Sequence, residues 1–271
     1  MISEADKRQF QDQGYLVIES LVPESLCAAA ISAISDFLDI DANEPASWLK
    51  PDIQGHGIVP LHHAQALWDI RQYPPVHEAF SDLYGTRALW VSIDRSSFKA
   101  PSAGFEAPYR VAAIHWDGDP RTGAALSIQG LVYLTDTAEE QGGFCCVPGL
   151  FRDLAGYLEH ADPDEPALKP DIAGFEVERI AAPAGSLILW DRRLPHSSGE
   201  NRASTPRFLA YVAMQPEGDE VAREALSGLY LEKRVPQWAV RQSVPGQVIP
   251  EPGEPARLSA LGRHLVGLER W

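Results

Sequence analysis

Two residues of one short segment, His115 and Asp117, carry side chains that bind metal ions, and a single residue separates them. Side chains two positions apart on an extended strand point to the same face. If residues 111–116 form a strand, the imidazole and the carboxylate can therefore reach one ion. The alternative is a solvated pair at the end of a surface strand, so a metal site needs a third ligand.

His196 is the best candidate for that third ligand, because it follows the apolar run 186–190 and an extended stretch, and it precedes a turn-rich loop. Two histidines and one carboxylate on one face of an octahedron leave three coordination positions open. Iron(II) oxygenases use these positions for a bidentate co-substrate and dioxygen. The three residues together favour oxygen-dependent chemistry at a mononuclear iron(II) site.

Arg207 lies eleven residues after His196 and begins a run, residues 207–214, that is otherwise almost entirely apolar. Residues 197–206 can reverse the chain, which would place the strand that begins at Arg207 beside the strand that carries His196. An arginine directed into an apolar barrel needs an anionic partner. A carboxylate of 2-oxoglutarate would supply it, since guanidinium binds carboxylate through two parallel hydrogen bonds. The alternative is an arginine at a strand end that pairs with a surface acid.

The elements that must position these residues are short strands and a few helices. Apolar spacing and capping signals predict helices that begin after Ser3 and near Pro23, a third at residues 75–84, and a last short one near 258–268. We expect Gly14 and Gly85 to end the first and third helices. Runs rich in β-branched and aromatic residues, separated by turns, predict strands. These strands are residues 15–18, 89–98, 125–134, 143–147, 175–180, 186–190 and 207–214.

Many short strands behind an N-terminal helical layer predict a mainly β protein with flanking α-helices, folded as a double-stranded β-helix, which is a jelly roll of the cupin-like kind. We expect a single domain over residues 1–271. Its helical layer would span about 3–85, its jelly-roll core about 86–215 and its C-terminal extension about 216–271. Barrel and sandwich folds reach this length as one unit.

Composition limits the partners and the location that we expect. No apolar run approaches the roughly 18 residues that a membrane-spanning helix needs, and the first residues lack the pattern of a signal peptide. We therefore expect a cytoplasmic protein with no membrane partner. A formal net charge of −15 disfavours nucleic acid. Cys27, Cys145 and Cys146 fit neither a disulfide framework nor a zinc pattern and should be small buried apolar residues.

Further motifs accompany the three candidate ligands. They are Gly14-Tyr15-Leu16-Val17 after a short helix, His115-Trp116-Asp117, residues 131–136 leading to 142–149, and residues 195–202 followed by Arg207. In order and spacing, over about residues 3–215, this set resembles the phytanoyl-CoA dioxygenase family. The resemblance implies that His115, Asp117 and His196 are the Fe(II) ligands and that Arg207 binds the distal carboxylate of 2-oxoglutarate.

The resemblance also points to two further co-substrate contacts, Lys99 and Gln129. For Lys99 the alternative is a surface lysine whose charged end stays in water. The chain departs from the family where Pro148-Gly149 continues to Leu150, Phe151 and Arg152 instead of a serine and histidine, and where Leu131 replaces a frequent tryptophan. Neither departure touches the ligand set, so both bear on substrate shape.

The function that we expect is that of an Fe(II)/2-oxoglutarate-dependent dioxygenase. It would use O2 to hydroxylate an unactivated C–H bond of a small metabolite, with release of succinate and CO2; desaturation and ring closure need only another placement of the substrate radical. The presence of Asp117 favours oxygenation, because halogenating relatives lack this carboxylate. A metal-dependent hydrolase and a non-catalytic cupin-like binding protein are the alternatives. We expect the loops near 43–63 and 100–110 and the C-terminal segment to select the substrate.

Two further clusters of charged and metal-binding residue types have structural interpretations. Helical spacing around His62 and His63 would turn one of these histidines toward solvent, in a structural role. Asp191 precedes Arg192 and Arg193 in an extended stretch, which predicts an ion pair that helps to orient the ligands. Asp119 belongs to a turn before Pro120 and is not expected to bind the metal.

Overall fold

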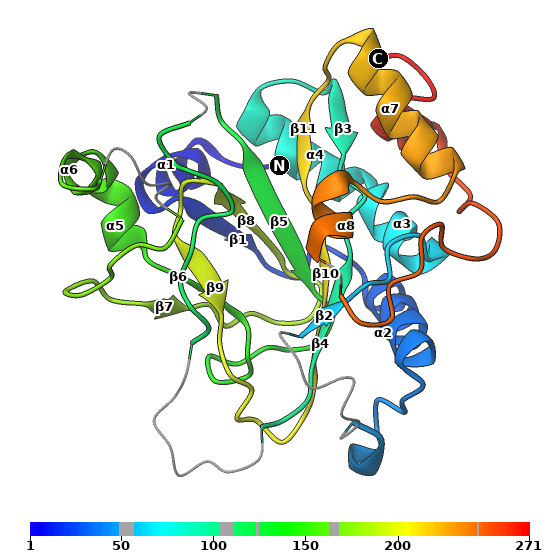
Figure 1. The fold of residues 1–271 in the computed structure, drawn as a ribbon, viewed down its shortest axis with the longest axis horizontal. Coiled ribbons are helices and arrows are strands. Elements are labelled where there is room, and N and C mark those ends of the chain that lie inside the picture. Colours follow the sequence, from blue (N-terminus) through cyan, green and yellow to red (C-terminus); the bar gives the residue numbers. More distant parts are fainter. Residues whose placement is uncertain (49–56, 103–110, 123–124, 163–167, 243) are drawn as a thin grey trace.

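The computed structural model describes residues 1–48, 57–102, 111–122, 125–162, 168–242 and 244–271, which form a mixed structure of helices and two antiparallel sheets (Figure 1). Within these ranges no helix has both the length and the apolar character needed to cross a membrane. The helices are α1 (Glu4–Gln13), α2 (Glu24–Leu38), the 3-10 helix η1 (Pro45–Trp48), α3 (Gln65–Arg71), α4 (Pro74–Tyr84), α5 (Pro148–Arg152), α6 (Leu154–Glu159), α7 (Glu220–Leu231), α8 (Gln237–Gln242) and α9 (Ala260–Leu265). The strands are β1 (Tyr15–Ile18), β2 (Ile58–Val59), β3 (Leu89–Val91), β4 (Ser96–Lys99), β5 (Ile128–Tyr133), β6 (Phe144–Cys146), β7 (Glu178–Arg179), β8 (Leu187–Asp191), β9 (His196–Ser198), β10 (Arg207–Tyr211) and β11 (Met214–Pro216).

The large sheet has the strand order β1-β8-β5-β10-β4-β2, with β11 joining β3 to the end of β5, and the small sheet has the order β7-β6-β9. Alternate side chains of the large sheet point to opposite faces. One face, with Leu131, Ile188 and Leu209, packs against Phe144 and Cys146 of the small sheet. The two sheets therefore face each other across an apolar layer.

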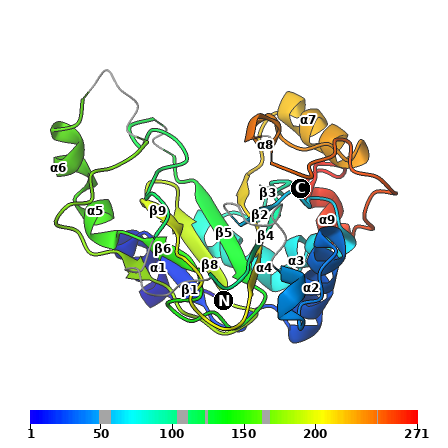
Figure 2. The ribbon, with the colours of Figure 1, turned by 60° about the horizontal axis from the view of Figure 1, so that its bottom comes forward.

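The other face of the large sheet packs against helices. Its residues, among them Val132, Leu189 and Phe208, share one core with residues of α2, α3 and α4. Figure 2 shows the resulting arrangement, with the small sheet, α5 and α6 on one side, β5 and β8 between, and α2, α3, α7 and α9 on the other side. The inner face of the large sheet is thus left for the small sheet and for a ligand.

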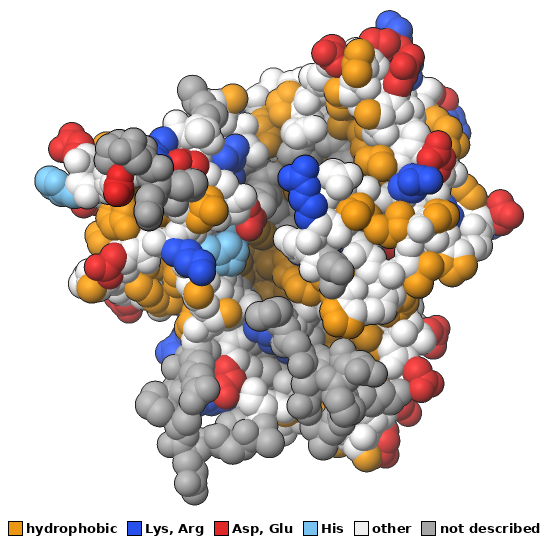
Figure 3. Space-filling view, viewed as in Figure 1, with side chains coloured by type: hydrophobic (Ala, Val, Ile, Leu, Met, Phe, Trp, Pro, Cys, Tyr) orange, Lys and Arg blue, Asp and Glu red, His pale blue; other side chains and the backbone are white. Residues whose placement is uncertain are grey.

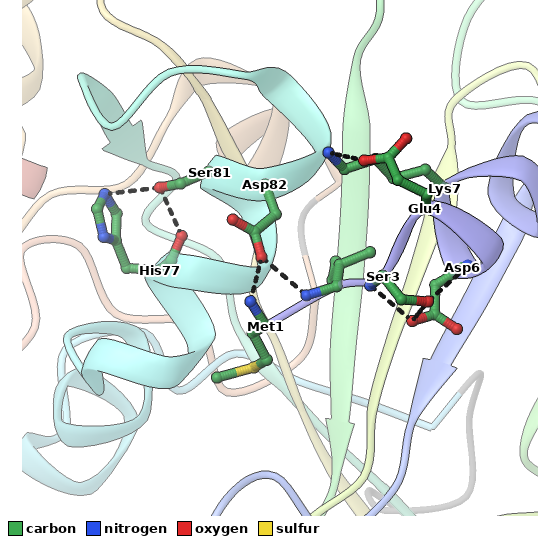
Figure 4. A network of polar contacts seen from close by, with 9 residues as sticks. Met1, Ser3, Glu4, Asp6, Lys7, His77, Ser81 and Asp82 are labelled. Atoms are coloured by element: carbon green, nitrogen blue, oxygen red, sulfur yellow. Dashed lines mark hydrogen bonds and ion pairs between the residues drawn. The ribbon is translucent and has the colours of Figure 1, made fainter.

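The N-terminal helix is fixed at both ends by local chemistry. The Ser3 hydroxyl accepts a hydrogen bond from the Asp6 backbone N–H while the Asp6 carboxylate accepts one from the Ser3 N–H, which is a capping box (Figure 4). Gly14 ends the helix with a φ of 78°, a left-handed conformation that glycine adopts without strain. The Asp82 carboxylate of α4 accepts hydrogen bonds from the Met1 amine and from the next backbone N–H. These contacts hold α1 against α4 and lead the chain into β1, which pairs with β8.

Several predicted elements are confirmed with shorter bounds. The three predicted N-terminal helices, the strand at 15–18, the ends at Gly14 and Gly85, and the burial of the three unpaired cysteines agree with the structure. The predicted strands 89–98 and 207–214 are each divided into two, and residues 175–180 pair at only two positions. The predicted strand 111–116 was wrong as a continuous strand, because its described residues form isolated bridges at Val111 and His115.

Three expectations about position were wrong. The strand β10 does not lie beside the strand that carries His196, because β9 pairs with β6 in the small sheet whereas β10 pairs with β4 and β5 in the large one. Neither His62 nor His63 faces solvent, since both side chains are buried. The predicted set of helices was incomplete, since it lacked α3, α5, α6, α7 and α8. Of the loops expected to select the substrate, residues 49–56 and 103–110 lie outside the described residues.

Candidate metal centre

The three candidate ligands converge at the edge of the small sheet. His196 begins β9, and His115 pairs with it directly, since each backbone N–H donates to the other residue's carbonyl at 3.0 Å. The Asp117 carboxylate lies 3.4 Å from Nε2 of His115 and 3.5 Å from Nε2 of His196. One ligand atom from each residue lies within 4.8 Å of the others. The structure therefore brings together the three residues that the sequence singled out.

Both imidazole rings present the same nitrogen to the site. Nδ1 of His115 lies 3.0 Å from the Ala113 carbonyl, and Nδ1 of His196 lies 2.9 Å from the Leu194 carbonyl. A carbonyl oxygen can only accept a hydrogen bond, so each Nδ1 carries a proton, and a ring in its neutral form then has its lone pair at Nε2. Metal-binding histidines are oriented by a second hydrogen bond of this kind. The rings are thus prepared for coordination through Nε2.

Gln129 connects the carboxylate to the large sheet. Its amide N–H donates to Asp117 Oδ2 at 2.6 Å, and its amide oxygen accepts from the Trp190 indole N–H at 3.0 Å. Because an indole can only donate, this chain of hydrogen bonds fixes which end of the amide faces the carboxylate. Gln129 therefore contacts a candidate ligand. Trp190 also packs on the ring of His196, with centroids 5.2 Å apart.

Hydrogen bonds at this site keep the Asp117 carboxylate negatively charged. Burial alone would raise the pKa of Asp117, but hydrogen bonds with His115, His196 and Gln129 reverse this, and the net pKa lies well below its usual range. Hydrogen bonding to Asp117 raises the pKa of His115. The side chain of His196 is 9% exposed, whereas those of His115 and Asp117 are 40% and 48% exposed. The group of three is therefore open on one side, and Figure 3 shows a histidine side chain on the wall of a central hollow beside hydrophobic surface.

Arg207 lies on the inner face of the large sheet, 1% exposed. Its Nε donates to the Gly142 carbonyl at 3.1 Å and its Nη1 to the Ser97 hydroxyl at 2.8 Å. Gly142 presents this carbonyl from a left-handed turn, with a φ of 73°. Burial lowers the pKa of Arg207, and among the described residues no carboxylate pairs with its guanidinium. A buried cation in this state is costly unless an anion joins it.

Lys99 stands directly opposite Arg207 in the pairing of β4 with β10. Its ammonium donates to the Ser198 hydroxyl at 2.7 Å and to the Gly199 carbonyl at 2.6 Å, so it is half-buried beside the strand that carries His196. Burial, with the nearby charge of Arg207, lowers the pKa of Lys99 to about 7. Two cationic side chains thus lie together on one wall.

The ion pair expected at Asp191 is present, and its role in orienting the ligands stays a prediction. The buried Asp191 carboxylate pairs with Arg193 at 2.6 Å, and Asp119 pairs with Arg121 in the turn before Pro120. Sequence reasoning missed Arg95, which is 9% exposed on the inner face. A signal for it existed in the sequence, because Arg95 precedes Lys99 by four residues. Alternation along an extended segment places both side chains on one face.

The donor set fits an octahedral ion such as Fe(II). Two neutral imidazoles and a carboxylate on neighbouring chain segments form the facial arrangement of non-haem iron(II) oxygenases. Zinc also accepts this set of ligands. The ligands alone therefore do not decide between these metals. The buried guanidinium of Arg207 is a feature that metal binding does not explain.

Comparisons with known proteins agree with this arrangement. The family model described as phytanoyl-CoA dioxygenase (PhyH) matches residues 10–209. A Dictyostelium discoideum protein whose name places it among the phytanoyl-CoA dioxygenases is 23% identical over 258 residues, covering 76% of this chain and 74% of that protein. The fold is similar to that of the epimerase SnoN, crystallised with Fe3+, alpha ketoglutarate and nogalamycin RO, with a TM-score of 0.57, 16% identity and 95% of each chain covered. It is also similar to that of a hypothetical protein from Escherichia coli, with a TM-score of 0.69, 15% identity, and 98% of this chain and 82% of that chain covered.

Proposed function

Because this chain belongs to the phytanoyl-CoA dioxygenase family, a family of oxidoreductases, we propose that it is an Fe(II)- and 2-oxoglutarate-dependent dioxygenase acting on a small molecule. The observation that carries the proposal is Arg207, a buried guanidinium with no acid partner among the described residues, opposite Lys99, whose ammonium contacts the strand that carries His196. A hydrolytic metal site has no need of such a cation, whereas the distal carboxylate of 2-oxoglutarate matches it in charge and geometry.

In this proposal His115, Asp117 and His196 hold Fe(II) on one face. When bound, the iron with 2-oxoglutarate and dioxygen supplies the oxidising power to break an unactivated C–H bond, with release of succinate and CO2. Arg207 and Lys99 orient the co-substrate by binding its distal carboxylate. Trp190 and Phe144, which pack on His196, exclude water from that side of the metal. SnoN, which binds Fe3+ and alpha ketoglutarate, supports the choice of both cofactors.

We extend the proposal to the architecture that holds the site. The two facing antiparallel sheets would be the two walls of a jelly roll, and residues 1–271 would form one domain. The metal would then lie at the open end between the walls, where His196 of the small sheet packs against Trp190 of the large one. This arrangement explains why the ligands and the cationic residues come from opposite sheets.

The proposal is tested by measuring succinate released from 2-oxoglutarate by the purified protein. We expect release that requires Fe(II), ascorbate and oxygen together and stops when the iron is chelated. Zinc should not replace iron, because zinc does not change its oxidation state. Zinc-supported turnover without succinate would indicate a hydrolase instead. Binding of metal without any turnover would indicate a cupin-like binding protein.

A substitution at Gln129 separates its two possible roles. In the Gln129→Leu variant the Asp117 carboxylate loses a hydrogen bond, so we expect iron affinity to fall by about 10-fold to 100-fold. At saturating iron the KM for 2-oxoglutarate should stay within about twofold of its original value, since we assign Gln129 to the metal ligand. An iron titration monitored by succinate release measures both constants. Gln215→Leu, on the exposed part of β11, is the control, and a variant that raises only the KM would assign Gln129 to the co-substrate instead.

The pKa of Lys99 predicts a pH dependence of co-substrate binding. A pKa lowered to about 7 means that the ammonium is charged below this pH and neutral above it. The groups that act on Lys99 are Arg207, whose charge favours the neutral amine, and Glu200, whose charge favours the ammonium form. The nearby Cys145 thiol is uncharged in this range, because burial raises its pKa to about 11. The KM for 2-oxoglutarate should therefore rise by up to about tenfold between about pH 6 and about pH 8.

The matching variants are Lys99→Met, which should show the higher KM and no such rise, and the exposed Lys169→Met, which should behave like the original protein. A pH profile of KM at saturating iron distinguishes them. If the Lys99→Met variant keeps the rise, another group titrates and Lys99 does not bind the co-substrate.

A further inference from the structure

Arg95 lies on the same wall as the residues assigned to 2-oxoglutarate, at the other end of that wall. Its carbonyl accepts a hydrogen bond from the Tyr211 N–H at 3.0 Å, which extends the pairing of β4 with β10 by one step. Alternation along this extended segment places Arg95, Ser97 and Lys99 on one face. Because Ser97 contacts the guanidinium of Arg207, this face is the inner one. Arg95 thus stands beside Tyr211, and Lys99 stands beside Arg207.

Among the described residues, no hydrogen bond or ion pair is made by the guanidinium of Arg95. The residue is 9% exposed, its Nε is buried without a hydrogen-bond partner, and in the described part of the chain no carboxylate pairs with it. Its one described ring contact is with Trp238 of α8, whose indole centroid lies 5.1 Å from the guanidinium carbon. Arg71 shows how a structural arginine differs, since its two terminal nitrogens donate to the carbonyls of His62 and Asp94. Burial of an unpaired guanidinium is costly unless a ligand supplies an anion.

Two electrostatic relations connect Arg95 with charged and polar groups on the inner face. Burial raises the pKa of the Tyr211 phenol, and the positive charges of Arg207 and Arg95 both oppose that rise, so the two guanidinium groups act on one hydroxyl. Burial also raises the pKa of Asp94, the residue before Arg95; the charges of Arg95 and Arg71 oppose this rise, and the charge of Asp117 adds to it. Arg95 and Arg207 therefore share the inner face of the large sheet, where both act on the Tyr211 phenol.

The surface around this cavity is otherwise apolar. Leu131, Trp190 and Leu209 belong to the cluster between the two sheets, and Tyr211 packs against it. Figure 3 shows hydrophobic side chains inside the hollow, with basic side chains near its edge. A molecule that fills this space would contact apolar walls over most of its surface and meet a cation at Arg95.

We infer that Arg95 binds a carboxylate of the substrate, so that the substrate is an apolar molecule with a carboxylic acid group. This inference rests on the proposed function, in which Arg207 and Lys99 are already occupied by 2-oxoglutarate. A carboxylate fits better than a phosphate, because Asp94, whose carboxyl group interacts with the charge of Arg95, would repel a dianion more strongly than a monoanion. Trp238 holds the guanidinium plane by stacking, which leaves its N–H edge free for two parallel hydrogen bonds.

The test uses the full chain loaded with Fe(II) and saturating 2-oxoglutarate in the absence of oxygen. Calorimetric titrations with 2-naphthoate, with its neutral amide 2-naphthamide and with inorganic phosphate compare three probes. We expect 2-naphthoate to bind at least about tenfold more tightly than 2-naphthamide, since one charge-assisted contact is worth this much. Phosphate should bind more weakly than 2-naphthoate. Equal affinity for the acid and the amide, or preferred binding of phosphate, would overturn the inference.

Variants assign the effect to one side chain. Arg95→Gln should lose the preference for the acid, and Arg95→Lys should keep part of it, because lysine retains the charge without the planar fork. Trp238→Ala, at a side chain that is 39% exposed, tests the same site through the stacking contact and should weaken 2-naphthoate binding severalfold. Arg241→Gln removes an equal charge from the exposed part of α8 and should leave the preference and succinate release unchanged.

The outcomes separate this inference from the proposed function. If the protein binds neither Fe(II) nor 2-oxoglutarate, the proposed function is contradicted. The inference then fails too, because it assumes that 2-oxoglutarate occupies Arg207 and Lys99. A chain that binds both, but whose preference for the acid survives Arg95→Gln and Trp238→Ala, contradicts the inference alone.

Discussion

Replacing Asp117 with alanine is expected to abolish succinate release and to weaken Fe(II) binding by at least about a hundredfold. Asp117 is the one anionic member of the described ligand group, and its low pKa keeps the carboxylate charged. Without it, two neutral imidazoles would have to hold a divalent ion. Binding is measured by equilibrium dialysis against Fe(II) without oxygen, and turnover is measured by succinate release.

The control for this substitution is Asp119→Ala, two residues along the chain. Asp119 contacts Arg121 in a turn and belongs to no metal-binding group among the described residues. Its loss should leave iron affinity within about twofold of the original value, as for a surface substitution. Iron binding that is unchanged in Asp117→Ala, or lost equally in both variants, would show that the metal lies elsewhere.

Replacing Arg207 with methionine is expected to raise the dissociation constant of 2-oxoglutarate by about a hundredfold or more. Two charge-assisted hydrogen bonds to a carboxylate are worth about 3 kcal/mol or more in a buried site. Without co-substrate, the variant should melt no lower than the original protein, because an apolar side chain replaces a buried cation without an acid partner. The lost donation to Gly142 and Ser97 acts against this gain but is smaller.

Thermal unfolding measures both effects of this substitution. At a co-substrate concentration about a hundred times the dissociation constant, the original protein should gain about 2.7 kcal/mol of stability, and Arg207→Met should gain almost none. Arg263→Met, on the exposed surface of α9 and on the other side of the molecule from the small sheet, removes an equal charge and should keep the gain. A variant at Arg207 that melts much lower, yet is still stabilised by 2-oxoglutarate, would identify Arg207 as a structural residue.

The site was predictable because its residues carry local signals. The spacing of His115 and Asp117 places both side chains on one face of an extended segment, and the runs around His196 and Arg207 marked those two residues as well. The family resemblance added Lys99 and Gln129. The geometry brings His115 and Asp117 together with His196, and it places Arg207 in the interior. Their roles as ligands and co-substrate contacts stay predictions until they are measured.

Pairing between distant segments was not predictable from the same signals. Residues 197–206 reverse the chain, but nothing in their composition says that the chain also crosses from the small sheet to the large one before Arg207. The contact between Gln129 and Asp117 depends on this crossing, since it joins the two sheets. His62 was misplaced for a related reason, because its burial comes from the C-terminal segment, where Glu251 accepts a hydrogen bond from the His62 backbone N–H.

The direct pairing of His115 with His196 makes sheet register a condition for metal binding. The two residues exchange both backbone hydrogen bonds at the edge of the small sheet, with no further strand to hold that edge among the described residues. A slip of one residue along β9 would turn the His115 side chain to the opposite face. The same slip would leave the His196 side chain where it is. All three ligand residues would still be present, but they could no longer bind one ion together. A bound ion would oppose that slip and so act as a cross-link that locks the edge in alignment.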